Sequence, residues 1–316
     1  MHIKQLAGVT AASLFLSGSL AQAEENLWLY AKGTDTRPEG SFELKLSNIS
    51  RIGKGTGDYQ FHDIRPEIEY GVNDSLTIGA ELMIFDHDYR VDTGDGSLDP
   101  LPDGESFSDT QFGGYELGLK YNILSPYKDF MGFSIGLGFE HRDKYRLDGS
   151  DIDQDSFTTT LFFQKNFLDD TLVFVLNPKI EFERRKNDGG DETVLEEEIA
   201  FDIAAGVSYR IAPKWFVGLE YRTQSDYLNP QIDGVFDPEL ERSSFDLTDW
   251  KLGSQHQIAH YFGPTIHYAE KEWWWTAGIL WQIAGHGRGE GAANAKGRNW
   301  DEHERYHVGF SLGYEF

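Results

Sequence analysis

Apolar side chains recur at every second position through most of this sequence. In the clearest run, residues 195–211, eight of the nine odd positions are apolar, while the even positions hold mainly Glu, Asp, Ala, Gly, Ser and Arg. Successive side chains of a β-strand point to opposite faces. The pattern therefore predicts a strand with one apolar and one polar face.

Eleven comparable runs accompany this one. They occupy roughly 41–52, 58–70, 75–90, 110–123, 130–146, 156–167, 171–185, 215–225, 254–269, 273–285 and 304–316. The twelve predicted strands are joined alternately by short turns, such as 71–74 and 212–214, and by longer segments, notably 91–109, 226–253 and 286–303. Alternation of short and long connections is typical of an up-and-down antiparallel barrel.

The same alternation is compatible with a membrane. No segment after Ala23 approaches the roughly 18 consecutive apolar residues that a membrane helix needs, but a barrel crosses the bilayer with alternating strands. We therefore predict an all-β fold over residues 40–316, a closed up-and-down transmembrane β-barrel of about 12 strands. A large water-soluble β-sandwich stays open as the alternative, because its strands also alternate.

Residues 1–23 have the features of a cleaved secretory signal peptide. Lys4 precedes an apolar run from Leu6 to Leu20, and Ala21-Gln-Ala23 fits an A-x-A cleavage site. Removal of Lys4 lowers the basic residues from 28 to 27 against 53 acidic ones, a formal net charge of −26. We expect no binding to nucleic acid. The chain has no cysteine, so it must fold without disulfides, which a large closed sheet can do.

Aromatic residues gather at both ends of the predicted strands. Those near the short turns are Tyr70, Tyr121, Phe130, Phe167, Tyr209, Trp215, Tyr268, Trp273 and Tyr314. Those near the long connections are Tyr59, Tyr89, Phe157, Phe182, Tyr221 and Tyr306. Two such girdles around an aliphatic band are typical of barrels whose rings lie at headgroup depth. A water-soluble sandwich does not account for them.

The final residues, YHVGFSLGYEF, alternate without interruption from Tyr306 to Phe316. In this the chain resembles the integral outer-membrane β-barrel proteins of Gram-negative bacteria, a porin-like and uncharacterised group, over everything after Ala23. Such proteins typically end on an alternating aromatic strand that the barrel-assembly machinery reads as an insertion signal. The matching residues here are Phe310, Leu312, Tyr314 and Phe316. The resemblance implies an outer-membrane location, contact with lipid and lipopolysaccharide, and N- and C-termini in the periplasm.

Side chains of the polar parity are predicted to line the lumen. They carry both signs, with acid in excess. The candidates for setting solute selectivity are Glu67, Glu81, Glu116, Lys120, Arg142, Glu181, Asp202, Arg210, Glu220 and Arg222. One interpretation is a passive channel for a small solute with a weak preference for cations. The other is a paired charge network that keeps a narrow barrel closed, in a protein with a structural or surface-interaction role.

The segment 24–39, between the signal peptide and the first strand, is predicted to be periplasmic. The glycines of lumen-facing parity fall in the half of the barrel nearer the short turns, so that half should be the roomier one. Leu27, Trp28 and Tyr30 are the candidates to fill it as a plug. The alternative is that these glycines only relieve curvature of the sheet.

Evidence for other chemistry in the sequence is weak. The acidic segment 91–109 could hold calcium or magnesium nonspecifically, but it misses the ligand spacing of an EF-hand, and we predict no cofactor and no specific metal site. His256 and His260, close to Ser254, leave a lipid-active enzyme as a third hypothesis. No catalytic motif surrounds them, so we predict no enzyme activity. The sequence names neither the solute nor the oligomeric state.

Overall fold

The computed structural model describes residues 26–55, 57–90, 106–187, 194–232, 235–236, 255–287, 297–300 and 302–316. Within these ranges the backbone forms one sheet of thirteen strands and no α-helix. No helix among the described residues is long and apolar enough to cross a membrane.

Twelve of these described strands are long. They are β1 (Phe42–Ile52), β2 (Asp58–Asn73), β3 (Leu76–Arg90), β4 (Ser106–Leu124), β5 (Gly132–Lys144), β6 (Asp151–Phe167), β7 (Leu172–Asn187), β8 (Val194–Ala212), β9 (Trp215–Ile232), β11 (Gln255–Ala269), β12 (Trp273–Gly287) and β13 (Tyr306–Glu315). The two-residue strand β10 (Val235–Phe236) pairs only with the end of β9.

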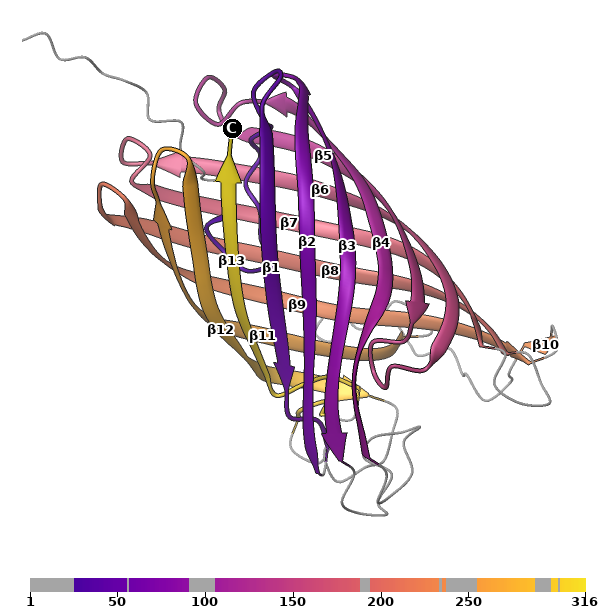
Figure 1. Ribbon diagram of the computed structural model, residues 1–316. Helices are drawn as coiled ribbons and strands as arrows, with labels where there is room; N and C mark the ends of the chain where they lie inside the picture. Colours follow the sequence, from indigo (N-terminus) through magenta and orange to yellow (C-terminus); the bar gives the residue numbers. More distant parts are fainter. Residues whose placement is uncertain are drawn as a thin grey trace, which may run out of the picture.

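The twelve long strands close into a barrel (Figure 1). Each pairs antiparallel with the strand before and after it in the chain, and β13 pairs with β1 over ten residue pairs from Glu43↔Glu315 to Ile52↔Tyr306. Closure leaves no long strand with an unpaired edge, which removes the cost of exposed backbone N–H and C=O groups. The prediction of a closed, antiparallel, twelve-stranded barrel is confirmed.

The apolar parity of the strands faces outward. On β13 and at the terminal residue, Tyr306, Val308, Phe310, Leu312, Tyr314 and Phe316 have exposed fractions of 37–61%. The intervening His307, Gly309, Ser311 and Gly313 are buried on the inner face. In a water-soluble sandwich the apolar rows would pack against each other, so the alternative fold is excluded. An outward apolar belt of this kind suits a lipid surrounding.

Several strands are longer than the alternation predicts. Residues 151–155, predicted as part of a loop, belong to β6, and β9 continues to Ile232 rather than ending near 225. The loop predictions were wrong there because the backbone ladder extends beyond the apolar belt, where both faces can be polar and the period-two signal is lost. Residues 91–105 lie outside the described residues.

Tyr59 and Tyr89, predicted as outward girdle residues, instead point inward. Their exposed fractions are 2% and 6%, and they pack with Phe61, Phe85 and Leu147. The Tyr59 hydroxyl donates a hydrogen bond to the Leu147 carbonyl oxygen at 2.9 Å. The girdle prediction failed for this pair because the loop between β5 and β6 folds over the inner face of β2 and β3, which offers aromatic rings an apolar environment.

The first and last residues of the barrel meet at the closure. Phe42 N–H donates to the Phe316 carbonyl oxygen at 2.9 Å, and Phe316 N–H donates back to the Phe42 carbonyl oxygen at 3.0 Å. Their rings stack with centroids 5.7 Å apart and planes 13° apart. The chain therefore ends on a residue that completes the sheet.

Deletion of Phe316 should lower the free energy of unfolding by about 2 to 4 kcal/mol, because it removes two backbone hydrogen bonds and one aromatic pair. The measurement is urea unfolding of protein refolded in detergent, which separates stability from cellular assembly. Leu168→Ala, an exposed residue in a short turn at the same end of the strands, should stay within about 0.5 kcal/mol of the unmodified protein. Equal stability of the truncated and full-length proteins would show that the closure does not depend on Phe316.

Candidate functional site

Residues 26–37, termed the N-terminal segment, lie inside the barrel before the chain enters β1. Glu220 on β9 holds the innermost part of this segment. Its carboxylate accepts hydrogen bonds from the backbone N–H groups of Leu29 at 2.9 Å, Tyr30 at 2.8 Å and Ala31 at 2.7 Å. Glu220 itself is fully buried. Charge-assisted bonds from several N–H groups to one carboxylate are strong, so this side chain fixes the local backbone.

Tyr30 forms the tip of the segment. Its hydroxyl lies 2.8 Å from His307 Nδ1, and the guanidinium of Arg222 lies 3.8 Å from the centre of its ring. His307 in turn stacks on Tyr261, with ring centroids 4.1 Å apart, and its Nε2 lies 3.2 Å from a carboxylate oxygen of Glu304. The tip therefore ends in an aromatic and charged cluster on β9, β11 and β13.

Glycines on the barrel wall make room for the segment. A Cβ atom on Gly206 would lie 2.4 Å from the Trp28 indole, and one on Gly309 would lie 2.6 Å from Leu29. Trp28 and Leu27 are both buried, and the Trp28 indole N–H donates to the Val207 carbonyl oxygen at 3.3 Å. Any side chain at these two glycines would displace the segment.

Two other glycines of the polar parity, Gly114 and Gly118, do not touch the N-terminal segment. Gly114 has a φ of +142° and pairs with Met83 where the register of β4 against β3 shifts, so its role is in the shape of the sheet. A Cβ atom on Gly118 would meet only a carbonyl oxygen 3.9 Å away. Both explanations offered for the glycines therefore have examples in this barrel.

Further anchors hold the rest of the segment across the lumen. Asn177 on β7 accepts from the Lys32 N–H at 2.7 Å and donates to its carbonyl oxygen at 3.1 Å. Gln164 on β6 accepts from the Thr34 N–H at 2.8 Å, and Thr77 on β3 accepts from the Arg37 N–H at 2.7 Å. Side chains of the wall make each of these bonds. The segment thus crosses the interior from β9 to β3.

A cavity of about 380 Å³ lies beside the segment, and a second of about 140 Å³ lies nearer the end of the barrel opposite the short turns. Six residues line both: Arg51, Arg146, Lys179, Glu181, Asp202 and Arg222. The larger lining carries eight basic and eight acidic residues, and the smaller carries seven of each, with histidine neutral. The acid excess of the chain is therefore not in the described lining of the lumen.

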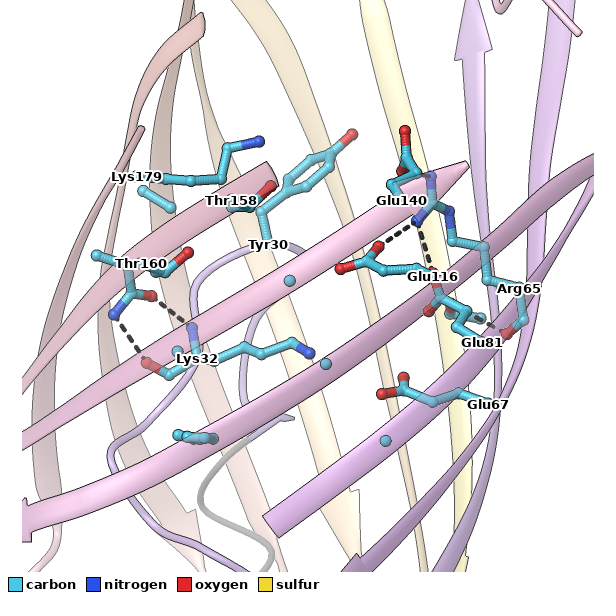
Figure 2. Close-up of a pocket in the computed structure, with 18 of the residues that line it drawn as sticks. Tyr30, Lys32, Arg65, Glu67, Glu81, Glu116, Glu140, Thr158, Thr160 and Lys179 are labelled. Atoms are coloured by element: carbon cyan, nitrogen blue, oxygen red, sulfur yellow. Dashed lines mark hydrogen bonds and ion pairs between the residues drawn. The ribbon is translucent and has the colours of Figure 1, made fainter. Parts of the chain in front are cut away.

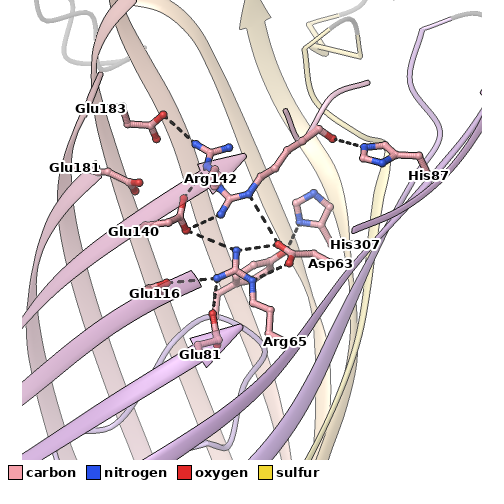
Figure 3. A network of polar contacts seen from close by, with 12 residues as sticks. Asp63, Arg65, Glu81, His87, Glu116, Glu140, Arg142, Glu181, Glu183 and His307 are labelled. Atoms are coloured by element: carbon pink, nitrogen blue, oxygen red, sulfur yellow. Dashed lines mark hydrogen bonds and ion pairs between the residues drawn. The ribbon is translucent and has the colours of Figure 1, made fainter. Parts of the chain in front are cut away.

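Arg65 on β2 is the centre of an ion-pair network in the larger cavity (Figure 3). Its guanidinium contacts Asp63 at 2.7 Å, Glu81 at 2.6 Å, Glu116 at 3.4 Å and Glu140 at 3.8 Å. One cation thus serves four carboxylates. Charges removed from bulk water in this way require partners, because an unpaired buried charge is costly.

Two more arginines extend the network toward the end of the barrel opposite the short turns. Arg142 contacts Glu140 at 2.7 Å and Glu183 at 3.1 Å, and Arg146 contacts Glu140 at 2.8 Å. At that end, Lys54 lies 3.5 Å from Glu304. Burial alone would raise the pKa of Glu304, but Lys54 and the hydrogen bond with His307 hold that pKa well below its usual range. Glu304 is therefore a fixed negative charge beside the tip of the segment.

The structure places the ten predicted selectivity residues in four environments. Those lining the larger cavity are Glu67, Glu81, Glu116, Lys120, Glu181, Asp202 and Arg222. Arg142 lines only the smaller cavity. Glu220 instead anchors the N-terminal segment. Arg210 lines neither cavity and donates to the Asp170 carbonyl oxygen at 2.8 Å, at the short turn after β6.

The alternating pattern does not distinguish the anchors from other lumen residues. Gln164, Asn177 and Glu220 are buried polar residues on the inner face, and nothing in the spacing shows that they face another segment. Their only signal is that they lie in the half of the barrel nearer the short turns, with the lumen glycines.

The described residues do not assemble the metal or catalytic candidates into a site. Within the described ranges, no group of three or more His, Asp or Glu residues is arranged to hold a metal ion. The acidic residues 91–105, the side chain of His256 and Ser254 lie outside what the structure describes. His260 Nδ1 lies 2.8 Å from the Tyr221 hydroxyl.

Comparisons with known proteins place the chain in a family and a fold. The model of DUF6662, described as a family of unknown function, matches residues 20–316. No curated protein matches the sequence significantly. The COG4313 outer membrane channel from Pseudomonas putida F1 is similar in structure, with a TM-score of 0.58 and 10% identity over 90% of this chain and 98% of that one. At this identity the likeness shows a shared barrel fold.

Two other solved barrels are less similar. The NanC porin has a TM-score of 0.44 and 10% identity over 86% of this chain and 98% of its own. LpxR from Salmonella typhimurium has a TM-score of 0.41 and 6% identity over 87% and 99%.

Gly206→Val should displace Trp28 from the wall without disturbing the outward face of β8. We expect the Trp28 indole to become more accessible to water. Its fluorescence is obtained by subtracting the signal of the matching Trp28→Phe variant, and quenching of that fluorescence by iodide should increase. Gly118→Val is the matched control, since that position is open, and it should leave quenching of Trp28 unchanged. Unchanged quenching in Gly206→Val would show that Trp28 does not rest on this glycine.

Proposed function

We propose a passive channel function for this chain, which belongs to the family of unknown function DUF6662. After removal of residues 1–23, the barrel resides in the Gram-negative outer membrane, inserted by the barrel-assembly machinery through Phe310, Leu312, Tyr314 and Phe316. Its apolar parity contacts lipid and lipopolysaccharide, and its short turns and both termini face the periplasm. The outward exposure of that parity supports this placement.

The observation that carries the proposal is the pair of adjoining, charge-lined cavities. Figure 2 shows the larger one with the N-terminal segment beside it. A lumen that only needed to be filled could be packed with side chains, as in the smallest barrels. Here the lining is polar and retains space for a small molecule. In this proposal Leu27, Trp28 and Tyr30 act as a plug, and the solute passes when the plug moves.

The plug is held by few groups at its tip. Glu220 supplies one carboxylate for three backbone N–H groups, so loss of this single anchor frees the backbone of residues 29–31 together. These bonds are strong, but water offers the N–H groups a replacement once the segment leaves the lumen, which lowers the net free energy that holds the segment in place. Such a segment can exchange between two arrangements without unfolding the barrel.

Charge selectivity in this proposal is weak. The lining is balanced in sign, which gives neither cations nor anions a strong advantage inside the lumen. The whole chain carries 53 acidic residues against 28 basic ones, and its negative field raises the local concentration of cations at the mouth. A small preference for cations follows.

A closed barrel with a structural or surface-interaction role is the second candidate. The network around Arg65 favours it, because one guanidinium that bridges Asp63, Glu81 and Glu116 ties the neighbouring strands β2, β3 and β4 together on the inner face of the wall. No observation on the described residues favours a lipid-active enzyme, and we propose no catalytic role.

Deletion of residues 24–36 should convert rare or small current steps in a planar bilayer into stable, larger conductance. Glu220→Gln should raise the open fraction in the same direction, since an amide cannot accept three N–H bonds as a carboxylate does. Glu39→Gln, an exposed change beyond the plug, should match the unmodified protein. Unchanged current after the deletion would show that the N-terminal segment does not plug the lumen. Absence of current in every folded variant would favour the closed barrel.

A further inference from the structure

The larger cavity presents opposite charges from opposite sides. Figure 2 shows Lys32 reaching into the space from the N-terminal segment, with Glu116 on the barrel wall across from it. Thr158 and Thr160 on β6 also line the space. At about 380 Å³, the cavity lies at the lower end of the sizes that small-molecule sites have.

Glu116 is the least satisfied carboxylate of the network. Among the described residues its one ion pair is with Arg65 at 3.4 Å, and that guanidinium also serves three closer or more buried carboxylates. The Glu116 side chain is 35% exposed within the barrel, compared with 5% for Asp63 and 7% for Glu140. Its carboxyl group therefore faces the cavity with room for a further polar partner.

Lys32 is the corresponding cation. Asn177 bonds both its backbone N–H and its carbonyl oxygen, so the side chain starts from a fixed point. Across the part of the chain that the structure describes, no carboxylate lies within ion-pair distance of the Lys32 ammonium. Lys32 lines the larger cavity, and Figure 2 shows its side chain extending from the segment into that space.

We propose that this cavity binds a small zwitterionic solute, with the solute's ammonium at Glu116 and its carboxylate at Lys32. Such a molecule satisfies both groups at once and adds no net charge to a lining that is already balanced. A simple anion or cation would leave one of the two unpaired, which costs free energy away from bulk water. The inference deepens the proposed channel function and rests on it only for the route of the solute.

The first test is binding to the purified full-length barrel in detergent, measured by saturation-transfer NMR. Glycine, 4-aminobutanoate and 6-aminohexanoate sample three separations of the two charges, and the best binder reports the distance between the partners. Butanoate, butylamine and butan-1-ol are matched single-charge and neutral probes. We expect the best zwitterion to bind at least about tenfold more tightly than any of these three, because one charge-assisted contact corresponds to roughly that factor.

The second test uses single substitutions. Glu116→Gln and Lys32→Gln should each weaken binding of the best zwitterion about tenfold, and Glu116→Gln should abolish its advantage over butanoate. Lys128→Gln and Glu39→Gln, both exposed, are the matched controls. Folding of each variant is checked by heat-dependent migration in electrophoresis. Equal binding of all six probes, or full affinity in both folded variants, would overturn the proposal.

Conduction and binding separate this inference from the channel proposal. Zwitterion binding by a barrel that passes no current would retain the site and refute the channel. Conductance without discrimination among the probes would retain the channel and refute the site.

Discussion

Hydrogen bonding of the backbone in an apolar surrounding is the constraint on which this structure depends. A strand edge facing lipid would leave N–H and C=O groups unpaired, so the sheet has to close, as β13 does against β1. Closure imposes a period of two on every strand, because one parity faces outward and the other faces the lumen. The polar character of the interior is therefore a consequence of the apolar exterior and not a separate feature of the sequence.

A narrow lumen lined by the polar parity brings charged side chains into contact. In the larger cavity equal numbers of basic and acidic residues meet, and Arg65 is shared among carboxylates from β2 to β5. Complete pairing would favour a rigid, closed interior. The pairing here is incomplete at Glu116 and Lys32, which both line the larger cavity. The same physics that holds the wall together thus leaves a site for a solute.

The alternation in the sequence was sufficient to predict the strands, their closure and the outward direction of residues such as Phe310 and Leu312. It failed at Tyr59 and Tyr89, where parity depends on a loop that folds inward and not on the strand itself. The alternation also could not predict that Glu220 anchors the N-terminal segment. That residue meets Tyr30 across 190 positions of sequence, and only the path of the N-terminal segment decides which lumen carboxylate becomes an anchor.

The plug and the proposed solute site share Lys32, and this links them energetically. A ligand shifts an equilibrium between two arrangements by the difference in its affinity for them, and the effect is reciprocal. A zwitterion that bridges Lys32 to Glu116 while Glu220 still holds residues 29–31 stabilises the plugged arrangement by its own binding free energy. A zwitterion whose charges are too far apart for that geometry gains this contact only after the segment moves. The length of the solute therefore determines whether it holds the barrel closed or helps to open it.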